Sequence, residues 1–160
     1  MKILVLYYSK GGNTRRLAEA VGEGAGEVAG AEVVLRHTRD VTKEDFVEAR
    51  GLVIGSPVYF GTMAAQLKQV LDDFVGVRKK MENKVGAAFT TSGDATGGKE
   101  TTMLSIIQAM LIYGMIIVGD PLSATGHYGT ACVGAPDDAA LANGRKLGRR
   151  VAELAMQLDS

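Results

Sequence analysis

The chain alternates between short apolar runs and longer segments in which apolar residues recur every three or four positions. The apolar runs cover residues 2–8, 31–36, 51–55, 84–91 and 114–119, and each is about the length of a β-strand. Most of them are apolar on both faces, which is typical of parallel strands covered by helices on either side. The pattern therefore predicts a parallel sheet between two layers of helices.

The segments between the runs have helical spacing. Their apolar stripes are Leu17, Val21, Ala25 and Val28; Leu67, Val70, Leu71 and Phe74; Met103, Ile106, Ile107, Met110 and Leu111; and Leu147, Val151, Leu154 and Leu158. A short fifth helix is expected over residues 42–49, with Thr42 as its N-cap and Asp45 at the capping-box position. Five strands alternating with five helices predict a doubly wound α/β fold, in which ligands bind beyond the carboxyl ends of the strands.

Composition narrows the class of protein. The 160 residues are enough for one domain, expected to span residues 1–160. The 18 basic and 18 acidic residues cancel, so the chain lacks the basic field that nucleic acid or an anionic membrane attracts. One cysteine, no signal peptide and no long apolar segment favour a cytoplasmic protein. With two histidines in the whole chain, no metal site is expected.

Two of the loops at the expected ligand edge are rich in polar or aromatic residues. Ser9 to Thr14, "SKGGNT", offers hydroxyls and two glycines at the start of a helix, which suits a phosphate group. An ordinary N-cap by Asn13 or Thr14 accounts for the same residue types. The loop "SPVYFG" that begins at residue 56 carries Tyr59 and Phe60, which either stack on a planar ring or cover the core.

A third loop, "TTSGDATGGKETT", is close to a nucleotide-binding P-loop. Gly93, Gly98 and Lys99 fit the pattern G-x-x-x-x-G-K, but Glu100 stands where a Ser or Thr would bind magnesium. No strand ends in the acidic residue that supplies the other magnesium ligand. We therefore expect this loop to hydrogen-bond the polar edge of a ring system rather than to hold ATP.

Together the three loops resemble those of the flavodoxin-like family, and most closely those of the WrbA-type NAD(P)H:quinone oxidoreductases, or multimeric flavodoxins. The resemblance runs through "LVLYYSKGGNTRRLAEAV", "GSPVYFGTMAAQLKQVLD", "FTTSGDATGGKETT", "YGMIIVG" and "GHYGTACVG". It implies a three-layer sandwich with a five-stranded parallel sheet of order 2-1-3-4-5. It also implies a bound FMN and a homo-oligomer, either a dimer or a tetramer.

The resemblance further implies which residues bind FMN. The phosphate would lie against the first loop, the ribityl chain and ring against the second, and the polar flavin edge against the third. These residues are Ser9, Lys10, Gly11, Gly12, Asn13 and Thr14; Pro57, Val58, Tyr59, Phe60 and Gly61; and Thr91, Ser92, Gly93 and Asp94. The flavin carries the chemistry, so no catalytic side chain is required, and His127 and Tyr128 stand only as candidates near the ring.

The implied activity is electron transfer from NADH or NADPH, through bound FMN, to a small acceptor such as a quinone. A flavodoxin-type electron carrier between protein partners is the alternative. Departures from the family at Gly11, Ile112 and Tyr113 favour the carrier, whereas the neutral net charge favours the enzyme. A phosphoacceptor receiver domain is excluded, because the strand ends "YYS" and "GS" lack the acidic residues that it needs.

Overall fold

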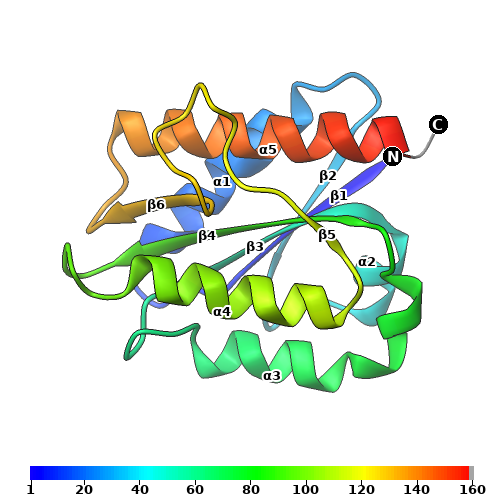
Figure 1. Cartoon of the computed structure of the whole chain (residues 1–160), viewed down its shortest axis with the longest axis horizontal. Coiled ribbons are helices and arrows are strands. Elements are labelled where there is room, and N and C mark those ends of the chain that lie inside the picture. The colour runs from blue at the N-terminus through cyan, green and yellow to red at the C-terminus, as the bar shows by residue number, and fades with distance from the viewer. Residues whose placement is uncertain (159–160) are drawn as a thin grey trace.

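A parallel β-sheet with helices on both faces forms the protein, shown here as a computed structural model that describes residues 1–158 (Figure 1). The strand order is β2-β1-β3-β4-β5, which confirms the expected order 2-1-3-4-5, and a further strand, β6, also pairs with β4. The strands are β1 (Lys2–Tyr7), β2 (Glu32–His37), β3 (Ala49–Pro57), β4 (Val85–Ser92), β5 (Ile116–Ile117) and β6 (Thr130–Val133).

The helices form the two outer layers. Helices α1 and α5 cover one face of the sheet, and α2, α3 and α4 cover the other (Figure 1). Their bounds are α1 (Asn13–Gly26), α2 (Lys43–Glu48), α3 (Ala65–Asp73), α4 (Lys99–Ile112) and α5 (Asp138–Leu158), with a 3₁₀ turn, η1 (Val75–Lys80), after α3. Among the described residues, every helix is too short or too polar to cross a membrane.

The core is two apolar layers that share the strands. Successive strand residues point to opposite faces, so Ile3 and Val5 pack under α1 and α5 while Leu4 and Leu6 pack under the other layer. Helices α1 and α5 approach so closely that a Cβ at Gly148 would overlap the carbonyl oxygen of Val21. The expected stripes hold with exceptions: Leu111 and Leu158 are exposed.

The short helix α2 begins as the sequence predicts. The Thr42 hydroxyl accepts a hydrogen bond from the Asp45 N–H at 3.2 Å, and the Asp45 carboxylate accepts one from the Thr42 N–H at 2.9 Å. This reciprocal pair is a complete capping box, confirming the assignment of both residues.

The fifth strand differs from the prediction over residues 114–119. Only Ile116 and Ile117 pair with β4, the Val118 N–H still donates to the Gly86 carbonyl at 2.9 Å, and residues 119–129 leave the sheet before β6 rejoins β4 farther along. Pro121 has no N–H for the ladder, and the buried Asp120 accepts a hydrogen bond from the Thr130 hydroxyl at 2.8 Å. The edge of the sheet is therefore built from two short strands, and its carboxyl end is Val133 rather than residue 119.

Candidate functional site

A cavity of about 170 Å³ opens at the carboxyl edge of the sheet, where the three polar and aromatic loops meet. It is lined by Ser9, Lys10, Gly11, Asn13, Thr14, Pro57, Val58, Tyr59, Thr91, Ser92, Gly93 and Gly134. Of the expected contact residues, Gly12, Phe60, Gly61 and Asp94 do not line it. Gly134 was not among the expected residues, although it ends the segment "GHYGTACVG" and lies just past β6.

The first loop presents the start of α1 to this cavity. Gly12 is the N-cap residue, with φ at 93°, so the alternative of an ordinary side-chain cap by Asn13 or Thr14 is wrong. The Ser9 hydroxyl instead accepts hydrogen bonds from the N–H groups of Gly12 and Arg15, at 3.1 and 3.3 Å. Within residues 1–158, the N–H groups of Asn13 and Thr14 have no acceptor. Two backbone donors at a helix N-terminus therefore remain for a ligand.

The first and third loops are joined inside the protein. The hydroxyls of Thr14 and Thr91 lie 2.8 Å apart and both side chains are buried. In the third loop, the Ser92 hydroxyl donates to the Asp94 carbonyl at 2.8 Å and accepts from the Asp94 N–H at 3.3 Å. Gly93 therefore lies in a closed turn, and the space around its Cα is open.

The second loop is a tight turn between Tyr59 and Thr62. The N–H of each donates to the carbonyl of the other at 3.0 and 3.1 Å, and the two residues between them, Phe60 and Gly61, both have positive φ, at 50° and 78°. Phe60 is fully exposed at the tip, so it neither covers the core nor lines the cavity. The turn rests on the third loop, because a Cβ at Gly98 would come within 2.9 Å of the Gly61 Cα.

Few ionisable groups surround the cavity. Lys10 is the one charged side chain among its lining residues. Burial raises the pKa of the Tyr59 hydroxyl, and the neighbouring Tyr8 raises it further. Burial also raises the pKa of the Cys132 thiol, close by in β6, to about 11, so this thiol stays protonated at neutral pH and is a poor nucleophile.

His127 and Tyr128 are not brought to the cavity. They precede β6, in which Thr130 pairs with Phe89, whereas Thr91 and Ser92 of the cavity pair with the far end of that strand. The structure thus puts the two candidates several residues back from the carboxyl edge.

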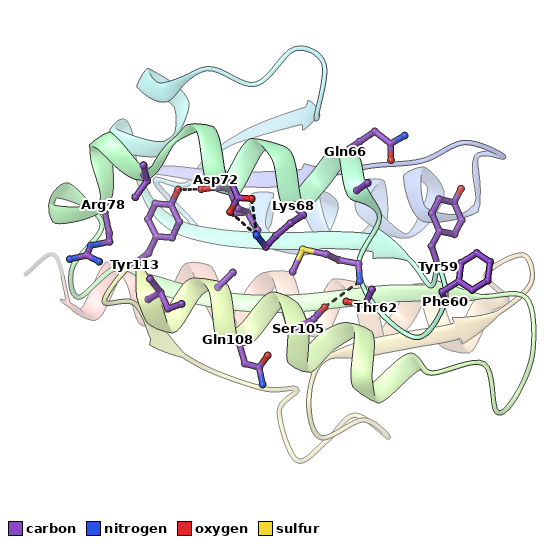
Figure 2. Close-up of a pocket in the computed structure, with 16 residues that line it drawn as sticks. Tyr59, Phe60, Thr62, Gln66, Lys68, Asp72, Arg78, Ser105, Gln108 and Tyr113 are labelled. Carbon is purple, nitrogen blue, oxygen red and sulfur yellow. Dashed lines mark hydrogen bonds and ion pairs between the residues drawn. The ribbon is translucent and has the colours of Figure 1, made fainter.

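A large apolar groove of about 970 Å³ runs from the cavity between α3 and α4 (Figure 2). Tyr59 and Phe60 stand at one end, and Tyr113 and Arg78 at the other. Three of its polar side chains have partners within the protein: the Tyr113 hydroxyl donates to the Leu71 carbonyl at 2.6 Å, and Lys68 pairs with Asp72 at 2.7 Å. The exposed side chains of Phe60 and Ile112 make its rim apolar.

The donors at the cavity suit the phosphate end of FMN. Backbone N–H groups at an uncapped helix start, hydroxyls on two sides and glycines without neighbours form a cradle for an anion. Tyr59 and the third loop stand beside it, where an aromatic ring system has both an apolar surface and polar partners.

Comparison with known proteins agrees with this geometry. Residues 1–130 match the family model described as NADPH-dependent FMN reductase. The chain is 37% identical to a protein named flavodoxin from Aquifex aeolicus, over 95% of this chain and 85% of the relative. It is 34% identical to a protein named NAD(P)H dehydrogenase (quinone) from Archaeoglobus fulgidus, over 98% of each.

Solved structures give the same result. A WrbA-like flavodoxin from Agrobacterium tumefaciens superimposes with a TM-score of 0.84 at 25% identity, over 98% of both chains. A flavodoxin from the domain Archaea superimposes with a TM-score of 0.81 at 27% identity, over 98% of this chain and 99% of that one. The match along the sequence, the sheet order and the loops at its carboxyl edge confirm the resemblance seen in the sequence, and the chain belongs to the NADPH-dependent FMN reductase family of flavodoxin-like oxidoreductases.

Proposed function

We propose that this protein is an FMN-dependent oxidoreductase that takes electrons from NAD(P)H and passes them to a small quinone-like acceptor. The observation that carries the proposal is the start of α1, where the N–H groups of Asn13 and Thr14 have no acceptor within residues 1–158 and line a cavity with hydroxyls and glycines from three loops. Membership of the reductase family supports it, as do several relatives named NAD(P)H dehydrogenase (quinone).

The first loop would hold the FMN phosphate. The N–H groups of Asn13 and Thr14 would donate to phosphate oxygens, and the positive end of the α1 dipole would favour their charge. Ser9 would keep its present role, because its hydroxyl already closes the loop over the helix start. The Lys10 ammonium at the rim would add a positive charge.

The second and third loops would hold the ring. Bound FMN accepts electrons from a nicotinamide and returns them to an acceptor, and this chemistry belongs to the cofactor. Tyr59 would supply an aromatic surface, and its raised pKa keeps the hydroxyl protonated as a hydrogen-bond donor. The N–H groups around Gly93 would face the polar edge of the ring, where donors favour the reduced, anionic form.

An electron carrier remains the second candidate. The specific observation in its favour is the fully exposed Phe60 beside the cavity, at one end of the apolar α3–α4 groove, which suits a protein partner that docks over an exposed flavin edge. A relative named flavodoxin, from Aquifex aeolicus, also supports it.

An anaerobic absorbance experiment separates the two candidates. The protein is loaded with FMN, and its visible flavin bands are followed after addition of NADH or NADPH. Rapid bleaching, followed by recovery of the bands when a soluble quinone is added, is expected of the oxidoreductase. A bound flavin that does not bleach favours the carrier, and failure to bind FMN at all refutes both.

We further propose that the protein forms a homo-oligomer, a dimer or a tetramer, and acts in the cytoplasm. The apolar rim of the α3–α4 groove supports self-association, and the single cysteine, Cys132, is compatible with a reducing compartment. Sedimentation velocity at micromolar concentration tests the oligomer, and a strict monomer would contradict it.

A further inference from the structure

A second groove of about 810 Å³ adjoins the cavity on the side of β2, and we call it the β2 groove. The ends of β1 and β2 form one wall and α3 forms the other. Its lining residues are Tyr8, Ser9, Lys10, His37, Thr38, Arg39, Ala65, Gln66, Gln69, Val70 and Asp73. Ser9 and Lys10 also line the cavity, so the two spaces adjoin, and the other lining residues of the β2 groove have no part in the proposed binding of FMN.

Two cations stand at the strand-end wall of this groove without a carboxylate partner. Within residues 1–158, neither Lys10 nor Arg39 forms an ion pair, although both are exposed. Nearby cations differ: Arg36 lies 3.2 Å from Asp45, and Arg15 lies 2.8 Å from its partner four residues along α1. The β2 groove therefore has a local positive charge on a chain whose net charge is zero.

His37 orients one of these cations. The Nδ1 atom of His37 accepts a hydrogen bond from the Arg39 backbone N–H at 3.2 Å and from its guanidinium Nε at 3.3 Å. The imidazole is in turn fixed by the rings of Tyr7 and Tyr8, whose centroids lie 5.4 and 5.6 Å away. Because Nε of Arg39 is used in this way, the outer nitrogens of the guanidinium remain available to a ligand.

The polarity changes along the groove. On the α3 wall, Gln66, Gln69 and Asp73 follow one another at about one-turn intervals, which carries the lining roughly 10 Å along the helix. The Gln69 amide donates to the Asp73 carboxylate at 2.7 Å, and the other carboxylate oxygen remains an acceptor. The groove thus offers cations next to the cavity and a hydrogen-bond acceptor farther away.

We propose that the β2 groove binds the adenosine half of NADPH, and that Arg39 contacts its 2′-phosphate. This inference rests on the proposed function, because it assigns the reductant of the same site. Lys10, which lines both spaces, would meet the pyrophosphate between the nicotinamide and adenosine halves. The guanidinium of Arg39 matches a phosphate with parallel N–H donors, which a lysine cannot do. The adenine amino group would point toward the Asp73 carboxylate at the far end.

The consequence is a preference for NADPH over NADH. A 2′-hydroxyl leaves the Arg39 charge without an anionic partner, whereas a 2′-phosphate makes charge-assisted hydrogen bonds to it. Such bonds correspond to roughly a 10- to 100-fold difference in affinity. Arg39 is thus a specificity residue and His37 a positioning residue, and neither is assigned a part in electron transfer.

The direct test measures binding of two adenosine nucleotides to the FMN-loaded protein by titration calorimetry. Adenosine 2′,5′-bisphosphate is expected to bind at least about tenfold more tightly than adenosine 5′-monophosphate. Arg39→Gln should reduce this ratio to near one while leaving the affinity for the monophosphate unchanged. Lys79→Gln is the matched control, because Lys79 is an exposed cation in η1, beyond the opposite end of α3.

A second variant tests the orienting contact. His37→Phe keeps an aromatic ring between Tyr7 and Tyr8 but removes the acceptor for Arg39. The affinity ratio should fall by several-fold with no matching change in the affinity for the monophosphate, which a purely structural role of His37 would not produce.

The inference is overturned if the two nucleotides bind equally well to the wild-type protein, or if Arg39→Gln leaves their ratio unchanged. The same preparations are mixed anaerobically with NADPH and with NADH. Equal bleaching by both overturns the inference and leaves the proposed function standing. Bleaching by neither refutes the proposed function, and the calorimetric ratio then still decides whether the β2 groove recognises a 2′-phosphate.

Discussion

Replacing Gly98 with alanine should disturb the contact between the second and third loops of the site. Gly98 is the N-cap residue of α4, with φ at 105°, a conformation that L-residues rarely adopt. A Cβ there would lie 2.9 Å from the Gly61 Cα and 2.9 Å from the Thr101 hydroxyl oxygen. The Thr101 side chain can rotate away, but the Gly61 Cα is backbone, so the Tyr59–Thr62 turn must move.

The cost has two parts that can be stated from the structure. The left-handed conformation costs an alanine about 1–2 kcal/mol. The contact with the Gly61 Cα is more than about 0.5 Å shorter than an ordinary carbon–carbon contact, and forced contacts of this kind cost about 1–3 kcal/mol. The lower entropy of the unfolded alanine variant returns about 0.4–1 kcal/mol. The net cost is therefore about 1–4.5 kcal/mol.

That cost should divide between folding and cofactor binding. If the turn stays in place, the whole cost lowers stability, and Tm falls by roughly 2–18 °C for a chain of this length. If the turn moves outward in the free protein, FMN must draw it back, and each 1.4 kcal/mol of the cost weakens FMN binding about tenfold. The two losses should therefore add to about 1–4.5 kcal/mol, by the same reasoning.

Thermal unfolding of the FMN-free protein and quenching of FMN fluorescence on titration measure the two parts separately. Gly76→Ala is the control, since Gly76 lies in η1 with no atom within 4 Å of its added Cβ and without a positive φ. It should change stability by less than about 0.5 kcal/mol and leave FMN affinity unchanged. A Gly98→Ala protein with wild-type Tm and wild-type FMN affinity would refute the reasoning about the contact between the two loops.

Three further predictions concern the scaffold and its pH dependence. Gly148→Ala should lower the free energy of unfolding in urea by about 1–3 kcal/mol, because its Cβ would overlap the Val21 carbonyl. Gly26→Ala should raise it by up to about 1 kcal/mol, because its Cβ would lie 3.6 Å from a valine methyl and alanine favours the helix. Burial lowers the pKa of Lys84 from 10.5 to about 8, so the unfolded chain binds its proton more tightly. Burying the charged Lys84 ammonium therefore destabilises the folded state fully below pH 8 and not at all above pH 10.5. The free energy of unfolding of the wild type should rise by up to about 3 kcal/mol between these two pH values. A Lys84→Met variant that kept this rise would show that Lys84 is not its source. Burial raises the pKa of Asp120, so the folded protein binds this proton more tightly than the unfolded chain does. The free energy of unfolding should therefore fall as pH rises from about 3.8, the value in the unfolded chain, through the folded-state pKa. Thermal unfolding of Asp120→Asn between pH 4 and pH 7 should lack this fall.

Local patterns in the sequence were sufficient for most of the architecture. An apolar run predicts a buried strand and a 3.6-residue period predicts a helix, because both patterns depend only on which faces of a single element are covered. The capping box of Thr42 and Asp45 was also predictable, since all its hydrogen bonds join residues three positions apart. The loops of the site were found for the same reason: their residue types directly follow recognisable strands.

The division of the fifth strand was beyond such patterns. The run at residues 114–119 has the composition of a strand, but its length in the sheet depends on β4, with which two separate segments pair. Pro121 and the Gly-rich segment after it indicated a break in the β-ladder. Gly134 could have been found by expecting a second short strand after that break, since it directly follows "TACV". The segment that rejoins the sheet begins at Thr130, whose hydroxyl donates to the buried Asp120 ten residues earlier, and no local rule predicts that contact.

By itself, the sequence determined the order of strands and helices, the family and the loops that form the cavity, because these follow from periodicity and from motifs only a few residues long. Only the tertiary structure decided that Phe60 points to solvent, that Gly134 completes the cavity and that Arg39 lines the same groove as Lys10, with neither side chain in an ion pair within residues 1–158. Each of these depends on contacts, or on the absence of contacts within residues 1–158, between segments far apart in the chain. Burial and charge pairing are set by the neighbours that folding supplies, so they are properties of the packed molecule rather than of any stretch of its sequence.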